Sequence, residues 1–307
     1  MGGTPLDVVT GAAGYTGRYI TARLLAAGRS VRTLTGHPGR PTPFGDAVEV
    51  RPLPFDDLGA LAASLRGVDT LYNTYWVRFA RGGVDHAVAV SRSRALIRAA
   101  ESAGVRRFVH VSITGADSSL SLPYFRGKGL VEEALRASGL SWGIARPALI
   151  FGPEDVLVHN IAWLLRRSPV FAVFGDGRYR VRPVHVDDLA RLCVDLGGAS
   201  ENTLANAVGP ERFTYADMVG QVAAAVGRRP PILHLPPMLA WTLTLPVGWM
   251  VGDVVVTRDE IRGLMAGLLD VDGPSTGERL FSAWLQEQPA DLGRTWASEM
   301  RRHFALR

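Results

Sequence analysis

The chain has 307 residues, of which 47% are hydrophobic and 21% charged, so it can form a sizeable core and extensive disorder is excluded. The formal net charge is +5, but the arginines are scattered with no basic run longer than a pair, which argues against a nucleic-acid partner. A single cysteine, Cys193, excludes an internal disulfide framework and suits the reducing cytoplasm, where we expect the protein to reside.

Short apolar runs alternate with helical patterns along the first half of the chain. We expect strands over 6–10, 31–35, 48–53, 70–74, 107–112 and 141–145, and helices over 16–27, 57–65, 84–103 and 124–137. Strands that alternate with helices at this spacing predict an α/β fold with a doubly wound parallel sheet, the Rossmann architecture.

The first predicted strand leads into a glycine pattern that opens a helix. Gly11 permits the tight turn, Gly14 allows close approach of a pyrophosphate, and Gly17 lets the helix pack near the sheet. The N–H groups at the start of the helix favour phosphate. We therefore predict that this loop binds NAD or NADP, with contacts from Gly11, Ala13, Gly14, Tyr15, Thr16, Gly17 and Arg18.

The end of the second predicted strand indicates which dinucleotide is bound. An acidic residue there would bind the ribose 2′-hydroxyl and select NAD, but residues 34–40 contain none. Gly36 leaves room, while His37, Arg40 and Arg18 supply positive charge for a 2′-phosphate. We predict NADP rather than NAD; the alternative is that Arg40 is a solvated loop residue.

Beyond Pro147 the alternation ends, and prolines and tryptophans become frequent. We expect residues 1–150 to form the dinucleotide-binding core and residues 151–307 a substrate-side region. Within that region, about 175–197 would return to the core sheet, through a strand near 179–185 and a helix from Asp187. The rest would form a mostly helical cap over the carboxyl ends of the strands.

Residues 230–252 contain no Asp, Glu, Lys or Arg, a length close to that of a membrane span. Five prolines break this run, so we expect buried helices or the lining of an apolar cleft rather than a transmembrane helix. Contact with a membrane surface is the alternative. Aromatic residues beyond the sixth strand would line the substrate cleft or pack in the core: Trp163, Phe171, Phe174, Trp241 and Trp249.

Several segments together resemble the extended and atypical short-chain dehydrogenases/reductases. They are the glycine loop at 10–17, Tyr124 with Lys128, Arg146-Pro147 with the six residues that follow, and residues 184–190. The resemblance covers about residues 5–200. It is closest to the NAD-dependent epimerase/dehydratase and NmrA-like branch, which includes relatives of the nucleotide-binding accessory subunit of respiratory complex I.

Tyr124 and Lys128 are four residues apart, so they share one face of a helix. A lysine ammonium beside a phenol stabilises the phenolate, which suits the tyrosine to general acid/base chemistry. We predict this role for Tyr124, with Lys128 tuning it; the resemblance implies that Lys128 also binds the nicotinamide ribose. The alternative is a buried tyrosine beside a solvated lysine.

The resemblance also implies a Ser or Thr after the fifth strand that orients the substrate oxygen. Ser112 and Thr114 both qualify because alternation places them on the same side of the chain; we favour Thr114, with Ser112 lining the cofactor. Further cofactor contacts are implied at the ends of the fourth and sixth strands, by Asn73, Thr74, Pro147, Ala148, Leu149 and Ile150.

Tyr75 and Trp76 depart from the family pattern, because small residues usually follow the fourth strand. We expect these aromatics to crowd the nicotinamide pocket, to contact a flat or apolar substrate, or to pack in the core. The loop before Tyr124 is shorter than in sugar-nucleotide epimerases, which disfavours a sugar-nucleotide substrate.

Together these features predict an NADP(H)-dependent oxidoreductase acting on a small, apolar organic substrate. The alternatives are an NAD(P)-dependent epimerase, dehydratase or isomerase, and a non-catalytic NAD(P)-binding sensor or assembly protein. We expect no metal site, because an N-cap at a strand-to-helix junction explains Asp187 and Asp188 beside His185. A monomer and a homodimer both remain open.

Overall fold

The computed structural model describes residues 4–288 and 291–300, and the chain divides into two compact units. The first unit combines the chain up to Pro147 with residues 186–207. The second combines residues 148–185 with the chain from Val208 onward. Each unit has its own core, and each is described separately below.

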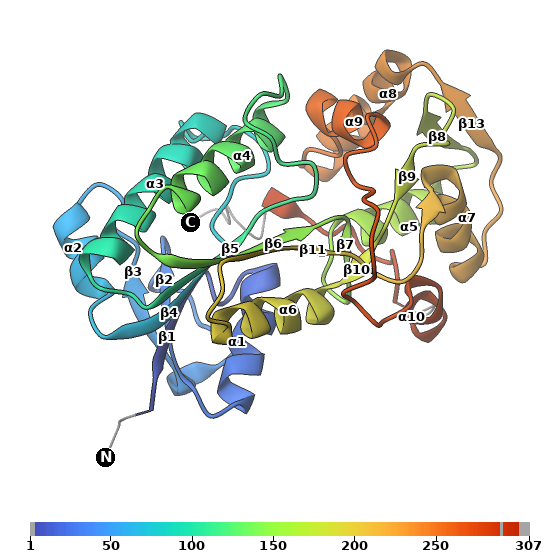
Figure 1. Ribbon diagram of the computed structural model, residues 1–307. Coiled ribbons are helices and arrows are strands. Elements are labelled where there is room, and N and C mark those ends of the chain that lie inside the picture. The colour runs from blue at the N-terminus through green and yellow to red at the C-terminus, as the bar shows by residue number, and fades with distance from the viewer. Residues whose placement is uncertain (1–3, 289–290, 301–307) are drawn as a thin grey trace. The chain divides into compact units, whose positions relative to one another are not determined.

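A seven-stranded parallel sheet forms the centre of the first unit (Figure 1). Its strand order is β11, β6, β5, β4, β1, β2, β3, and every neighbouring pair is parallel. The strands are β1 (Leu6–Thr10), β2 (Ser30–Thr35), β3 (Val48–Pro52), β4 (Val68–Asn73), β5 (Arg107–Val111), β6 (Ser141–Pro147) and β11 (Thr203–Ala207).

Helices cover both faces of this sheet (Figure 1): α1 packs with α6 on one face, and α2, α3 and α4 lie on the other. Because neither face is left to solvent, the central strands are apolar on both sides, and Val8, Leu71 and Phe108 are fully buried. The helices are α1 (Tyr15–Ala26), α2 (Leu58–Ser64), α3 (His86–Ser102), α4 (Pro123–Arg136) and α6 (Val186–Gly198), with a short 3₁₀ turn, η1 (Gly45–Ala47).

The side of the sheet to which the chain adds strands changes between β1 and β4. After β1 the chain adds β2 and β3 on one side, then crosses over to add β4, β5 and β6 on the other. In sheets of this kind the loops at such a reversal diverge, and ligands usually bind between them at the carboxyl ends of the strands. The glycine loop follows β1 directly and so lies at this position.

The predicted doubly wound parallel sheet is confirmed. Every strand and helix expected before residue 147 is present, with bounds shifted by no more than two residues. The segment that rejoins the sheet is 186–207 rather than about 175–197, because the strand added beside β6 is β11. The expected strand near 179–185 is instead two short strands, β9 (Arg180–Val181) and β10 (Val184–His185), both in the second unit.

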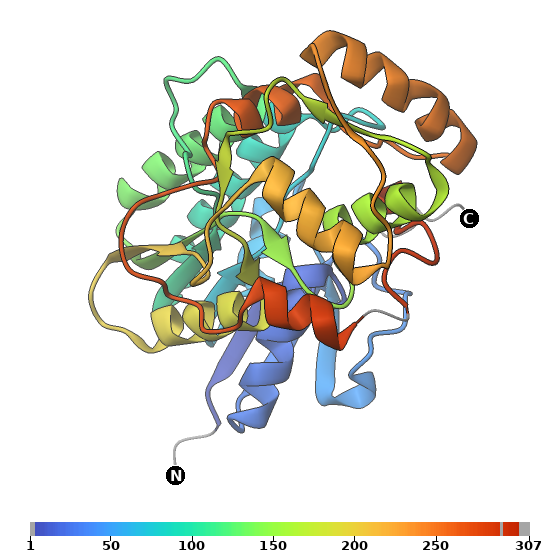
Figure 2. The same cartoon turned by 90° about the vertical axis from the view of Figure 1, so that its right-hand side faces the viewer.

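The second unit is built from helices and short paired strands (Figure 2). β10 pairs with β7, β9 with β12, and β8 with β13. Its core gathers around Phe151, Phe281 and Trp284. The Phe151 ring meets Phe281 edge to face and Trp284 at a tilt, and Phe281 stacks on Trp284. The further elements are β7 (Ile150–Phe151), β8 (Phe171–Phe174), β12 (Phe213–Thr214), β13 (Ile232–Leu235), α5 (Leu157–Arg167), α7 (Tyr215–Ala225), α8 (Pro237–Val251), α9 (Arg258–Met265) and α10 (Phe281–Glu287).

The uncharged stretch 230–252 forms β13 and α8. Of the aromatic residues expected to line a cleft or the core, Phe171 and Phe174 are buried, Trp163 and Trp241 are half-buried, and Trp249 is exposed. Among the residues that the structure describes, no helix combines the length and apolar character needed to cross a membrane.

Candidate functional site

The glycine loop is organised around the carbonyl oxygen of Gly11. Gly11 has φ +73°, a left-handed conformation that glycine adopts without strain, and its carbonyl accepts the N–H of Gly14 at 2.8 Å. A Cβ on Gly17 would collide with the same oxygen. The carbonyl therefore points into the start of α1, and α1 can begin close to the sheet only because residue 17 has no side chain.

Two threonines hold this loop against the sheet. Thr33 of β2 accepts the Ala12 N–H at 2.9 Å and donates to the Val9 carbonyl at 3.0 Å. Thr10 accepts the backbone N–H groups of Thr74 and Tyr75 at 2.8 and 3.1 Å, which joins the ends of β1 and β4. The loop is thus fixed from both neighbouring strands.

The N-terminus of α1 suits an anion. Its cap residue is Gly14, no side chain caps the helix, and its first turn contains no acidic residue. The N–H groups and the partial positive charge at this end are therefore not neutralised by a carboxylate of the first turn. Ala13 is exposed, and Tyr15, Thr16 and Arg18 are half-buried beside it.

The turn after β2 contains the residues expected near the adenine ribose. Gly36 and His37 are exposed, Arg40 is half-buried, and the Arg40 N–H donates to the His37 carbonyl at 3.1 Å. The turn therefore keeps His37 and Arg40 together at the carboxyl end of β2, the edge from which the glycine loop also starts.

Asn73, expected to contact the cofactor, is fully buried at the end of β4. Its amide nitrogen lies 3.2 Å from Nδ1 of His110, and its Oδ1 accepts from Thr10 at 3.3 Å and from the Tyr75 N–H at 3.1 Å. Thr74, the next residue, is half-buried and donates to the Thr10 carbonyl at 2.5 Å. Both side chains bond within the ends of β1, β4 and β5.

Ser112 follows β5 and is bound to a buried carboxylate. Its hydroxyl donates to Oε1 of Glu132 on α4 at 2.6 Å. Arg146 of β6 donates twice to the same carboxylate, at 2.8 and 2.6 Å, and once to the Ala116 carbonyl at 3.1 Å. Ser112 therefore serves to join β5, α4 and β6, and its hydroxyl proton is committed to Glu132.

Lys128 is the only lysine in the chain; the other 33 of the 34 basic Lys and Arg residues are arginines. It is buried on α4, and its ammonium donates to the carbonyl of Val111, the last residue of β5, at 2.7 Å. The ammonium also lies 4.4 Å from the centre of the Trp76 ring, in a cation–π contact. Desolvation by burial lowers the pKa of Lys128 to about 7, against an opposing effect of Glu132.

A group of aromatic rings surrounds Tyr124, one helical turn before Lys128. The half-buried Tyr124 ring meets Trp76 at 5.8 Å and His86 at 5.6 Å between ring centres, both edge to face. Trp76 stacks on His86 and packs against Gly127, where a Cβ would be 3.0 Å from the indole. Trp76 therefore covers Lys128 and sits beside Tyr124, and it also packs against the core of the first unit, one of the expected alternatives.

His110 is a buried titratable group beside Lys128. It lies within β5 and is fully buried, and burial together with the Lys128 charge lowers its pKa well below the ordinary value. Its Nε2 has no hydrogen-bond partner among the described residues. We conclude that His110 is neutral across the physiological range.

Thr114 and the end of β6 complete the set of expected residues. Thr114 is fully buried, and its N–H donates to the Pro147 carbonyl at 2.9 Å. Pro147 ends β6 and the first part of the first unit, whereas Ala148, Leu149 and Ile150 belong to the second unit. The first unit thus brings together the ends of β1, β4, β5 and β6 with Tyr124 and Lys128.

The sequence analysis did not identify Glu132, Arg146 or His110 as parts of this site. Glu132 had a signal, because Tyr124, Lys128 and Glu132 recur every four residues on one helix face. The use of lysine at a single position was a second signal that went unused. Arg146 and His110 carry no local pattern, since only the pairing of β4, β5 and β6 brings them beside these groups.

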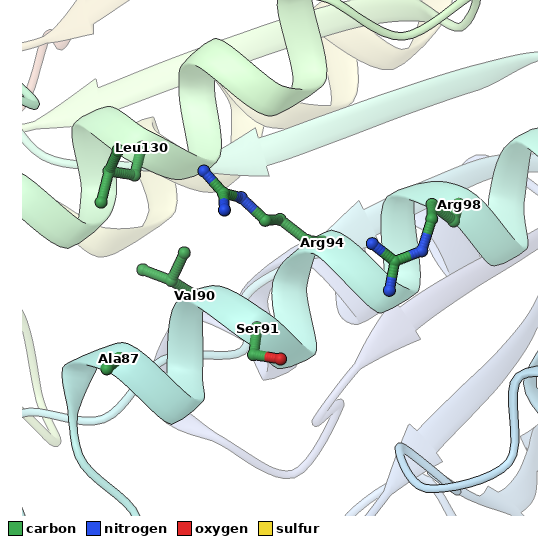
Figure 3. A pocket seen from close by; sticks show the side chains of 6 residues that line it. All are labelled: Ala87, Val90, Ser91, Arg94, Arg98 and Leu130. Atoms are coloured by element: carbon green, nitrogen blue, oxygen red, sulfur yellow. The ribbon is translucent and has the colours of Figure 1, made fainter.

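Three other features of the structure do not form a candidate site: the cysteine, the acidic and histidine side chains, and a surface hollow. Cys193 is buried in α6, and burial raises its pKa to about 12. Among the described residues no cluster of three or more His, Cys, Asp or Glu could hold a metal, and Asp187 pairs with Arg23 at 2.7 Å. A hollow of about 390 Å³ is lined by residues of α3 and by Leu130 of α4, and Arg94 reaches across it toward Leu130 (Figure 3). None of the expected site residues lines it.

Comparison with known proteins gives a consistent family. The sequence profile described as NAD(P)H-binding matches residues 11–157. A (4-alkanoyl-5-oxo-2,5-dihydrofuran-3-yl)methyl phosphate reductase of Streptomyces griseus is 30% identical over 227 residues, 72% of this chain and 74% of the relative.

Subunit 9 of the 1 alpha subcomplex of mitochondrial NADH dehydrogenase (ubiquinone) from Arabidopsis thaliana is 26% identical over 80% of this chain. The match spans 64% of that relative, less than two thirds of its length. Among solved structures, a nucleoside-diphosphate-sugar epimerase of Staphylococcus aureus aligns with a TM-score of 0.75. It covers 92% of this chain and 100% of its own at 15% identity, a likeness of fold alone.

The contact of Gly17 with the Gly11 carbonyl can be tested by Gly17→Ala. The added methyl group forces the loop away from α1, so we expect a free energy of unfolding lower by about 1–3 kcal/mol, measured with urea. Gly220→Ala is the matched control, because Gly220 lies in helix α7 with open space around it. That variant should be neutral or more stable by up to about 1 kcal/mol. Equal effects would contradict the packing role of Gly17.

The burial of Lys128 can be tested by its titration. Carbon-13 labelling of lysine gives a single side-chain resonance, and we expect its midpoint near pH 7 rather than near about 10.4. Because the folded pKa lies below the unfolded one, stability is lowest below pH 7 and rises as pH increases above it. The free energy of unfolding, relative to Lys128→Met, should rise by up to about 1.4 kcal/mol per pH unit between pH 7 and about 10.4, and level off outside that range. A constant difference would contradict this.

Proposed function

Because the chain belongs to the NAD(P)H-binding family, we propose that it is an NADP(H)-dependent oxidoreductase of the short-chain dehydrogenase/reductase type. Its substrate would be a small, apolar organic molecule with a carbonyl, alcohol or conjugated alkene. The observation that carries the proposal is the pair Tyr124 and Lys128, with the only lysine of the chain buried at the carboxyl end of β5.

The residues of the glycine loop fit a dinucleotide. A loop that excludes any side chain at position 17 and a helix start without an acid or a cap suit a pyrophosphate. Gly11, Ala13, Gly14 and the first turn of α1 would hold it, and Arg40 with Arg18 and His37 would favour a 2′-phosphate. When bound, the nicotinamide ring supplies the carbon that gives or takes a hydride.

Tyr124 would move a proton to or from the substrate oxygen. Its ring is half-exposed and lies among Trp76 and His86, surroundings that favour a flat or apolar substrate over a sugar. Thr114 would orient the substrate oxygen, the role that the resemblance implies for a Ser or Thr after β5. Arginine could not replace Lys128 in this arrangement, because its planar head is larger than an ammonium group.

Lys128 would act through its charged form, which stabilises a phenolate at Tyr124 and donates to ribose hydroxyls. With a pKa of about 7, the ammonium is only partly charged at neutral pH. The Glu132 carboxylate raises that pKa, and Glu132 is itself fixed by Arg146 and Ser112. These two residues thus position the carboxylate that keeps the lysine charged.

One observation favours a second function, that of a non-catalytic NAD(P)-binding protein. The Trp76 ring packs against the buried Lys128 ammonium, which leaves less room there for a ribose hydroxyl. A respiratory-chain subunit among the relatives fits such a role. An epimerase or dehydratase remains a third candidate, and net consumption of NADPH separates the oxidoreductase from it.

Replacing Tyr124 by Phe should lower turnover by about 10²–10⁴-fold, since a general acid/base contributes that much. Turnover is followed as NADPH oxidation with a panel of aldehydes, ketones and conjugated enones, and NADPH binding by fluorescence should change less than about twofold. Tyr179→Phe is the matched control, because the Tyr179 hydroxyl is buried with no hydrogen-bond partner among the described residues. Unchanged turnover in Tyr124→Phe would exclude the catalytic role; binding without hydride transfer by the native chain would favour the second function.

Replacing Arg40 by Ser should weaken NADP binding about tenfold and leave NAD binding nearly unchanged, because only NADP carries the 2′-phosphate. Calorimetric titration with each dinucleotide measures both affinities. Arg66→Ser, an exposed arginine at the end of α2, controls for the loss of one positive charge. An equal effect of Arg40→Ser on both dinucleotides would contradict the preference.

A further inference from the structure

Helix α8 exposes an unusual amount of apolar surface. Trp249 is 89% exposed, Met250 64% and Leu243 53%, and Met238, Leu239 and Leu245 are exposed to a similar extent. The fifteen residues of α8 include no charged side chain, and only Ala240 is buried. An ordinary surface helix has a polar face toward water, and α8 has none.

The hydroxyl side chains of α8 are satisfied within the helix. Its two hydroxyl side chains bond to their own helix: Thr242 donates to the Leu239 carbonyl and Thr244 to the Trp241 carbonyl, both at 2.7 Å. At its end, Gly252 in the left-handed conformation closes the last turn. A protein interface usually pairs hydrogen-bonding groups across its rim, whereas a lipid surface requires that such groups be satisfied internally.

One side of α8 is attached to the second unit, and positive charge lies near its N-terminal half. Ala240 packs with Phe174 and Ile261, and the Arg258 guanidinium lies 4.1 Å from the Trp241 ring centre. Arg228 and Arg229 are exposed shortly before β13, and Arg258 is exposed at the start of α9.

The acidic residue closest in sequence to α8 faces inward. Asp253 accepts the Trp296 indole N–H at 3.1 Å and the Glu299 N–H at 2.8 Å. From 228 to 258 the chain therefore exposes three arginines, and its only carboxylate is engaged within the unit. The acidic residues that follow are also occupied: Glu260 caps α9, and Asp259 lies 3.7 Å from Arg262.

We propose that α8 is an interfacial membrane-binding helix that takes an anionic lipid surface as its partner. The apolar side chains enter the boundary between headgroups and acyl chains, Trp249 lies at headgroup level, and Arg229 and Arg258 meet the lipid phosphates. Arg228 instead donates to the Leu165 and Arg166 carbonyls of α5. Figure 2 shows α8, in orange-brown, as a separate rod in the second unit.

The length of α8 sets how it lies. Fifteen residues span about 22 Å, less than the hydrocarbon core of about 30 Å, so the helix lies along the surface. Pro246 within the helix removes the donor for the Thr242 carbonyl, which keeps that part of the helix near water. A peripheral, reversible attachment follows, and it does not depend on the proposed enzymatic activity.

The test measures binding of the full chain to vesicles. Vesicles of phosphatidylcholine alone and of phosphatidylcholine with phosphatidylglycerol are sedimented with the native chain and with Leu243→Ser/Trp249→Ser. The matched control is Leu58→Ser/Leu280→Ser, two similarly exposed leucines outside α8. We expect binding that requires the anionic lipid, a loss of about tenfold or more in the α8 variant, and no change in the control. Arg229→Gln should weaken binding by up to about fivefold.

A second measurement follows Trp249 directly. Brominated lipid should quench the fluorescence of the native chain, and Trp249→Phe should remove most of that quenching. Circular dichroism and NADPH binding of each variant separate a membrane effect from unfolding and from failure of the proposed function. No binding to anionic vesicles, an equal loss in the control, or α8-dependent self-association without vesicle binding would each overturn the proposal; the last would assign α8 to a second copy of the chain.

Discussion

The site in the first unit depends on one buried cation. Lys128 is the only lysine of the chain. Its ammonium donates to a β5 carbonyl and contacts the Trp76 ring, and the charge of Glu132 raises its pKa. A charged group removed from water must either be stabilised by its neighbours or lose its charge. At Lys128 the charged and neutral forms are close in free energy near neutral pH, because the pKa is about 7. An arginine at this position would keep its charge at any physiological pH, so the choice of lysine preserves a group that can titrate.

The residues around Lys128 follow from this balance. Glu132 favours the charged form, and Arg146 with Ser112 holds Glu132 in place. Trp76 offers a π face but also excludes water, so it both attracts the cation and lowers the pKa. Removal of Glu132 would therefore lower the pKa of Lys128 further, whereas removal of Trp76 would expose the ammonium and bring its pKa closer to that of a lysine in water.

Local patterns allowed much of this to be predicted. The strand–helix alternation predicted every strand and α-helix before residue 147, though not the short turn η1. The spacing of Gly11, Gly14 and Gly17 predicted the loop, because each of these features depends on neighbours in sequence. Tyr124 and Lys128 were found because a helix repeats every four residues. The returning segment was placed too early, because two short strands before α6 have the same apolar pattern as a strand of the main sheet, and only pairing distinguishes them.

Contacts between distant elements could not be predicted from such patterns. The bond of Ser112 to Glu132, and the position of Trp76 over Lys128, join segments that only the sheet brings together. The apolar run 230–252 was recognised, but whether its side chains face a core or a surface depends on what packs against it. In the structure only Ala240 of α8 is buried, although neighbours such as Trp241 are partly covered. Exposed apolar side chains on an uncharged helix are unfavourable in water, and contact with a lipid surface removes that free-energy cost. The apolar run that first indicated a buried cleft therefore supports an interfacial helix once its exposure is known.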